Sequence, residues 1–139
     1  MLVFRRAPLL VAIVSICALP SVAAAESNYV YCDNGLRCVM APCPSNSALD
    51  LATGKIIKGV SIDIEELPQQ DKALDLSDKL YAGKVVVVGS IENRTQTLNG
   101  KQYTLPWLVA TGIERASRDS ERGHCSSHWR SHLQRPSSS

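Results

Sequence analysis

The stretch Lys84-Val-Val-Val-Val-Gly-Ser-Ile-Glu92 is the most densely β-branched part of this chain, and Gln102-Tyr-Thr-Leu-Pro-Trp-Leu-Val-Ala-Thr-Gly-Ile-Glu114 follows it closely. Between the two stands Asn99-Gly100, a dipeptide that readily adopts the positive φ angles of a type I′ turn. β-branched and aromatic residues on both sides of such a turn are typical of paired strands. The pattern therefore predicts one long β-hairpin around which the rest of the chain is organised.

The turn also predicts which residues of this hairpin face each other, because loop length sets the register of the two strands. With a constant register, the predicted pairs are Leu98 with Lys101, Gly89 with Ala110, and Val87 with Gly112. Small residues then oppose one another at one level of the hairpin. That arrangement indicates a bend or the close approach of another backbone.

Two segments near the amino-terminal side of the hairpin also have strand character. Residues 29–40 form two short apolar arms around Asp33-Asn-Gly35, which predicts a first, smaller hairpin. The segment Val60-Ser-Ile-Asp-Ile64 alternates apolar and polar residues, and Ile56 extends its apolar face. This alternation predicts a third strand of about eight residues.

Residues 66–81 lose that alternation and instead space their apolar residues by three and four. Pro68 stands where a first helical turn accepts proline, so we expect one helix, or two broken turns, ending at Gly83. The order is then three strands, a helix and two strands. It predicts an α+β, β-rich fold, either a small five-stranded antiparallel sheet or an OB-like barrel with the helix between strands 3 and 4.

The two ends of the chain differ from the part between them. Residues 1–25 combine a basic start, an apolar run too short to span a bilayer comfortably and a small-residue cleavage site, which is the pattern of a removable signal peptide. Residues 115–139 are Ser-rich and have no apolar period, which predicts a disordered basic tail. We therefore expect a domain at residues 26–114, exported to the periplasm or secreted, with no membrane span after signal removal.

Charge argues against nucleic acid as a partner. Without the predicted signal peptide the chain carries 13 basic and 13 acidic residues, a net charge of zero. Residues 26–114 carry a net charge of −3, and residues 115–139 a net charge of +3. Since nucleic-acid binding rests on clustered positive charge, the domain itself lacks the main requirement.

Cysteine spacing predicts a structural disulfide. Cys32, Cys38 and Cys43 lie close together, and export to an oxidising compartment favours their oxidation. In a tight first hairpin Cys32 and Cys38 do not face each other, so we expect Cys43 to pair with either Cys38 or Cys32. Cys125 brings the count to four and allows three pairings in all.

Histidine occurs only in the tail, at His124, His128 and His132. Residues 26–114 therefore lack an imidazole base, and we expect no enzyme activity and no cofactor. The alternative is a metal-binding protein or enzyme that uses these histidines with Cys125, because a spacing of four places them on one helical face. Ser-rich, Gly-containing sequence is a poor helix former, which disfavours this alternative.

Four aromatic residues on predicted strands are candidates for binding another molecule. Tyr29 shares a face with Tyr31, and Tyr103 shares a face with Trp107. Aromatic side chains in these positions more commonly pack into a core, so core packing is the default expectation for both pairs.

The stretch Cys38-Val-Met-Ala-Pro-Cys-Pro-Ser45, with an alternating strand, an acidic helical stretch and a Gly-Lys-Val-Val-Val-Val-Gly strand after it, resembles an uncharacterised group of small secreted bacterial domains. Those domains carry a short Cys-to-Cys loop containing proline, and the resemblance implies no activity. The basic, Ser-rich tail looks like the secretion signals of bacterial type IV effector proteins. We therefore expect an exported, non-enzymatic interaction domain whose unknown protein partner belongs either to the producing organism or, as for a virulence effector, to a host.

Overall fold

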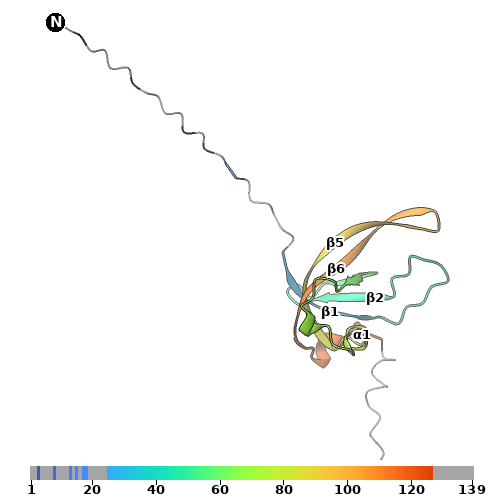
Figure 1. Ribbon diagram of the computed structural model, residues 1–139. Coiled ribbons are helices and arrows are strands. Elements are labelled where there is room, and N and C mark those ends of the chain that lie inside the picture. Colours follow the sequence, from blue (N-terminus) through green and yellow to red (C-terminus); the bar gives the residue numbers. More distant parts are fainter. Residues whose placement is uncertain are drawn as a thin grey trace, which may run out of the picture.

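The computed structural model describes residues 25–126 and, before them, the isolated positions 3, 8, 13, 15, 17 and 18. The described part of the chain is β-rich, with a single mixed and open sheet of six strands in the order β3-β2-β1-β5-β6-β4 (Figure 1). Its elements are β1 (Ser27–Asp33), β2 (Asn46–Asp50), β3 (Ile56–Lys58), β4 (Ser61–Asp63), the 3₁₀ helix η1 (Gln69–Asp71), α1 (Leu76–Tyr81), β5 (Val85–Leu98), β6 (Lys101–Ala116) and the 3₁₀ helix η2 (Asp119–Arg122).

The long hairpin forms as predicted at its turn. Asn99 and Gly100 have φ angles of 51° and 77°, and Leu98 pairs with Lys101. The pairing of Gly89 with Ala110 is confirmed as well. The predicted pairing of Val87 with Gly112 is wrong by one residue.

A β-bulge causes that difference. Val88 pairs with Gly112 while its neighbour Gly89 pairs with Ala110, so Thr111 is an extra residue in β6. Such a bulge shifts every pair beyond it and increases the local twist of the strand. Val87 therefore faces Ile113.

The predicted first hairpin within residues 29–40 does not form. β1 instead pairs with β2, from Tyr29 opposite Asp50 to Asp33 opposite Asn46, and on its other side Tyr29 pairs with Val87 of β5. β1 is buried on both faces, so it needs a strand on each side to satisfy its backbone. Residues 34–45 leave the sheet as a loop.

The prediction of five antiparallel strands is also wrong, and so is the barrel. The segment predicted as one strand breaks at Gly59, which has a φ of +73°, and continues as two short strands. β3 pairs with β2 at one edge of the sheet, and β4 lies parallel to β6 at the other edge. β3 and β4 are therefore neighbours in the sequence but form the two opposite edges of an open sheet.

The helical stretch packs over one face of this sheet. It forms as two short turns, η1 and α1, which is one of the two forms that the sequence allowed. Leu76 and Leu80 of α1 are buried against a cluster that includes Tyr31, Val87 and Leu108. No helix within the described residues is long and apolar enough to cross a membrane.

The carboxyl-terminal part of the described chain corrects the predicted boundary at residue 114. β6 continues to Ala116, η2 follows, and Cys125 forms a disulfide. Disorder was the wrong prediction for residues 115–126, because a turn of 3₁₀ helix and a covalent bond fasten them to the sheet. Residues 127–139 lie outside the described part, as does most of the predicted signal peptide.

Candidate functional site

The loop at residues 34–45, which we name the disulfide loop, extends away from the packed part of the molecule between β1 and β2 (Figure 1). A disulfide between Cys38 and Cys43 closes its outer part. This is one of the two pairings that the sequence left open for Cys43. Two apolar residues, Val39 and Met40, lie inside the ring that this bond closes.

Polar contacts hold the base of the disulfide loop in place. Asp33 accepts two hydrogen bonds from the Arg37 guanidinium, 3.1 Å and 2.7 Å long, and a third of 2.7 Å from the backbone N–H of Gly35. Asn34 donates from Nδ2 to the carbonyl oxygen of Pro44 at 2.7 Å and to the Ser47 hydroxyl at 2.8 Å. Both ends of the loop are therefore bonded to each other and to β2.

The outer part of the loop is apolar and faces solvent. Val39 is fully exposed, with a relative accessibility of 103%, and Met40 is 70% exposed. Leu36 adds a third large apolar side chain at 46%. Half of the six exposed large apolar side chains in residues 25–126 therefore lie on this one loop. Contiguous exposed apolar side chains mark interaction sites more often than isolated ones do.

A second projecting feature is the outer part of the long hairpin, residues 93–106, which we name the hairpin arm. Beyond the pairings with β1 and β4 it is a two-stranded ribbon, and in Figure 1 it extends on the same side of the molecule as the disulfide loop. One face carries half-buried residues: Arg94, Gln96, Leu98, Tyr103 and Leu105. The other face carries exposed polar residues: Asn93, Thr95, Thr97, Gln102 and Thr104.

The root of the hairpin arm is held by a charged cluster around Trp107. The Arg94 guanidinium lies over the Trp107 ring, 4.6 Å from its centre, and donates to Asp63 at 2.8 Å and to Glu92 at 2.5 Å. A backbone hydrogen bond from Glu65, followed by that from Arg94, lowers the pKa of Asp63. Since Asp63 belongs to β4, the cluster ties the arm to the edge strand.

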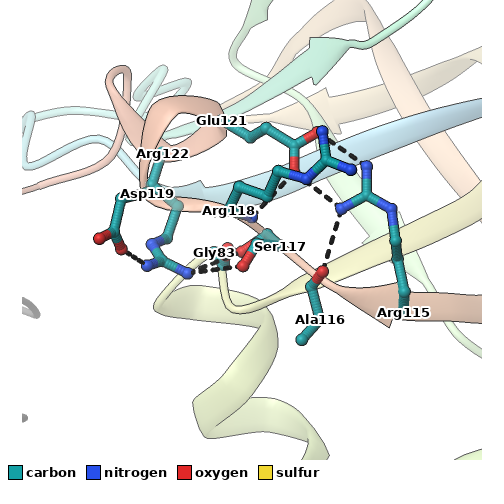
Figure 2. A network of polar contacts seen from close by, with 8 residues as sticks. All are labelled: Gly83, Arg115, Ala116, Ser117, Arg118, Asp119, Glu121 and Arg122. Atoms are coloured by element: carbon teal, nitrogen blue, oxygen red, sulfur yellow. Dashed lines mark hydrogen bonds and ion pairs between the residues drawn. The ribbon is translucent and has the colours of Figure 1, made fainter.

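Residues 115–126 form a latch that returns to the body of the molecule, and Figure 2 shows its polar contacts. Glu121 accepts two hydrogen bonds from Arg115, at 2.8 Å and 2.9 Å, and one of 2.8 Å from the backbone N–H of Arg118. The pKa of Glu121 is lowered to about 2, first by Arg115 and then by Arg118.

Arg122 fastens the other side of the latch. It donates to the carbonyl oxygen and the hydroxyl of Ser117, at 3.1 Å and 3.0 Å, and to the carboxylate of Asp119 (Figure 2). The Ser117 hydroxyl in turn donates to the carbonyl oxygen of Gly83, next to α1. The latch is therefore bonded to the loop that joins α1 to β5.

The latch ends at a cluster of two cysteines and a histidine. Cys32 of β1 is bonded to Cys125, and one nitrogen of the His124 ring lies within 4.8 Å of both sulfur atoms. His124 Nε2 is 2.9 Å from the carbonyl oxygen of Val30 and 3.9 Å from the sulfur of Cys125. Burial lowers the pKa of His124, and its bond to Val30 opposes that effect.

Two of the predicted site residues belong to the core and are unavailable for binding. Tyr29 and Tyr31 are 5% and 1% exposed, because β1 lies in the middle of the sheet with both faces covered. The edge of the Tyr31 ring contacts Tyr81 of α1, with centroids 5.8 Å apart. Desolvation by burial, followed by the influence of Tyr81, raises the pKa of Tyr31.

The other predicted residues divide between two places. Tyr103 and Trp107 lie on the hairpin arm and at its root, and both are half-buried. His124 and Cys125 come together, but with Cys32 as the third member. His128 and His132 lie outside the described residues, so of the predicted group of four only His124 and Cys125 are described.

Sequence reasoning missed Val39 and Met40. The signal was present, because two apolar residues stand between cysteines only five positions apart. A ring that short has no interior in which to bury them. The pairing of Cys32 with Cys125 was missed as well, and a separation of 93 residues carries no local signal for it.

Comparisons with known proteins identify no relative. No protein-family model, no curated protein and no solved structure matches this chain.

Proposed function

We propose that this protein is an exported, non-enzymatic binding protein whose disulfide loop presents Val39 and Met40 to a protein partner. The observation that carries the proposal is the nearly complete exposure of two apolar side chains on a loop closed by a disulfide. Two disulfides in the described residues are typical of exported proteins, which supports a periplasmic or secreted location.

The energetics favour binding at this loop over a role in the fold. Full burial of a Val or Met side chain is worth roughly 1.5–3 kcal/mol, and this chain leaves both in water. A partner with an apolar pocket gains that free energy. The disulfide and the Asp33–Arg37 contact also restrict the loop before binding, which lowers the entropy cost of roughly 0.5–1.5 kcal/mol for each ordered side chain.

The hairpin arm supports the same proposal as a second contact. Leu98, Tyr103 and Leu105 lie on one face of a ribbon that is paired to no other strand beyond its root. Tyrosine supplies a large contact area with few rotatable bonds, which suits it to interfaces. A partner that contacts both projections meets an apolar surface on each.

The non-enzymatic part of the proposal rests on the contents of residues 25–126. All four cysteines in this part are in disulfides, so none of them is a free thiol nucleophile. Its one histidine, His124, belongs to the latch and contacts the backbone of β1 and the Cys125 sulfur. Neither group is presented to a substrate in a cleft.

A pair of matched variants tests the role of the disulfide loop. We expect Val39→Ser with Met40→Ser to abolish capture of the partner, whereas Leu74→Ser, which changes an equally exposed apolar residue elsewhere, keeps it. Because all three side chains lie in water, both variants should unfold at the temperature of the unchanged protein. The measurement is quantitative mass spectrometry of proteins captured from periplasmic extract and from host lysate.

The two extracts also separate a partner inside the producing organism from a host partner. A protein captured equally by the loop variant and the Leu74 variant would contradict the proposal. A photo-crosslinking residue placed at position 40, and in a second preparation at position 74, gives an independent reading. Crosslinks should form at position 40 alone.

An effector must also be delivered into the host cell. Since residues 115–126 form the latch, a secretion signal in the tail must lie in residues 127–139, which carry two arginines, two histidines and no acid. A translocation reporter fused to the full chain should be delivered, and one fused to a chain ending at Ser126 should not. Equal delivery of both would remove the tail from this role.

A further inference from the structure

We infer that the protein, once its disulfides are reduced, binds one zinc-class divalent ion at Cys32, His124 and Cys125. Two cysteine sulfurs and an imidazole are the ligands that zinc prefers, and three protein ligands leave a fourth position for water. The donor atoms already lie within 4.8 Å of one another. This site is separate from the disulfide loop and the hairpin arm, so it stands independently of the proposed binding function.

The cluster is held together by contacts that do not depend on the disulfide. The backbone N–H of Ser126 donates to the carbonyl oxygen of Asp33 at 2.8 Å, directly beside the two cysteines. The His124 ring is bonded to Val30, two residues before Cys32. The contacts of Arg115 and Arg122 anchor the rest of the latch. Reduction therefore leaves two thiols and an imidazole facing each other.

The sulfur atoms of the cluster pack closely against Gly83. A side chain at Gly83 would place its Cβ 2.7 Å from the Cys125 sulfur, so the glycine leaves the sulfur atoms room against the backbone. The His124 nitrogen that faces the Cys125 sulfur is Nε2, 3.9 Å away, so an ion that binds it takes the place of the 2.9 Å hydrogen bond from Nε2 to the Val30 carbonyl oxygen.

The reaction has two balanced steps. A phosphine reductant and one water break the S–S bond, each sulfur gains one electron and one proton, and the phosphine becomes its oxide. The ion then forms two metal–sulfur bonds and displaces the two thiol protons into the buffer. A dithiol that is itself oxidised to a disulfide replaces the phosphine in a cell.

The test uses Co²⁺ as a coloured stand-in for zinc and the purified chain without its signal peptide. The oxidised protein should take up no Co²⁺. The phosphine-reduced protein should take up one equivalent and show the sulfur-to-cobalt absorption of a thiolate complex. One equivalent of Zn²⁺ should displace the Co²⁺ and abolish the absorption.

Three variants locate the site. His124→Asn should weaken metal affinity at least about tenfold, and Cys125→Ser should remove the absorption. Cys38→Ser with Cys43→Ser, which removes the other two thiols, should change neither. A chain ending at Ser126 should bind as the full chain does, because the site does not use His128 or His132.

Two results would overturn the inference. The first is that the reduced protein stays folded by circular dichroism but takes up no stoichiometric ion, or that the Cys125→Ser variant binds the ion equally well. The second result applies when reduction unfolds the chain. Zinc should then restore the fold and raise the unfolding temperature, and a failure to do so contradicts the site.

Discussion

Gly89 is a position in the long hairpin where the fold leaves no room for a side chain. A Cβ built on this residue lies 2.2 Å from the carbonyl oxygen of Val109 and 3.2 Å from the Cα of Ala110. Both contacts are to backbone, which cannot rotate away. The sequence placed Gly89 opposite Ala110, and the structure shows that this level of the hairpin is a close approach of two backbones beside a bulge.

Gly89→Ala should therefore destabilise the protein, by about 1–3 kcal/mol, which is the usual cost of overpacking. Chemical denaturation measures the change in the free energy of unfolding. Gly112→Ala is the matched control, because its Cβ would have its nearest neighbour, Val88 Cβ, 4.0 Å away. Equal losses in the two variants would show that the contact at Val109 is not the cause.

At the scale of the element, the latch shows how a short segment with little apolar content is kept in place. η2 has four residues, none of them buried, so its own helical bonds contribute little. Its position rests on the ion pair of Arg115 with Glu121, on the hydrogen bonds of Arg122 to Ser117, and on the disulfide at Cys125. Charge therefore replaces hydrophobic burial in this element.

The latch should accordingly lose stability in acid. The pKa of Glu121 is lowered from 4.5 to about 2, so its ionised form stabilises the fold fully above about pH 4.5 and this contribution disappears as the pH falls through 2. Glu121→Gln should lower the unfolding temperature at pH 7, and the difference from the unchanged protein should close towards pH 2. Thermal melts across this range measure it.

Glu66→Gln serves as the control for that series, because Glu66 is an exposed carboxylate far from the latch in sequence. Its melts should follow those of the unchanged protein at every pH. A constant difference between the Glu121 variant and the unchanged protein down to pH 2 would contradict the assigned role of the carboxylate.

At the scale of the whole molecule, the two disulfides differ in the length of chain they close. Cys32–Cys125 spans 93 residues and joins the central strand β1 to the latch, whereas Cys38–Cys43 spans five. In the chain-entropy model the stabilisation grows with the logarithm of that length, to about 4.5 kcal/mol for the long closure and about 2 kcal/mol for the short one. A thin core of this size gains much from the first.

Cys32→Ala with Cys125→Ala should thus reduce the free energy of unfolding about twice as much as Cys38→Ala with Cys43→Ala. Chemical denaturation under oxidising conditions gives both values. The second variant should keep the fold and lose part of the partner binding, because its loop is no longer closed. Equal destabilisation by the two pairs would mean that loop length does not govern these bonds.

Local patterns in the sequence predicted the features that depend on neighbours along the chain. Asn99-Gly100 predicted the turn, β-branched residues predicted the long strands, and the register held as far as Gly89. Pro68 and the change of period predicted a helical stretch before β5. These signals are reliable because turn angles and amphipathic period act over a few residues.

Only part of the candidate site could be predicted from the sequence. Cys38 and Cys43 were named with Cys32 as candidates, and their ring could have pointed to Val39 and Met40. Tyr29 and Tyr31 could not be excluded as binding residues before the structure placed β1 in the middle of the sheet. Burial of a strand on both faces is set by its neighbours, and the neighbours of β1 are distant in sequence.

The sequence by itself determined a β-rich chain with a long hairpin, a short helical stretch and cysteines suited to oxidation. Only the tertiary structure decided that β1 pairs with β2 and β5, that the chain breaks at Gly59 to supply both edges, and that Cys32 meets Cys125 beside His124. The reason is physical. Hydrogen-bonded turns depend on adjacent residues, whereas strand order and long-range disulfides depend on the packing of the whole chain.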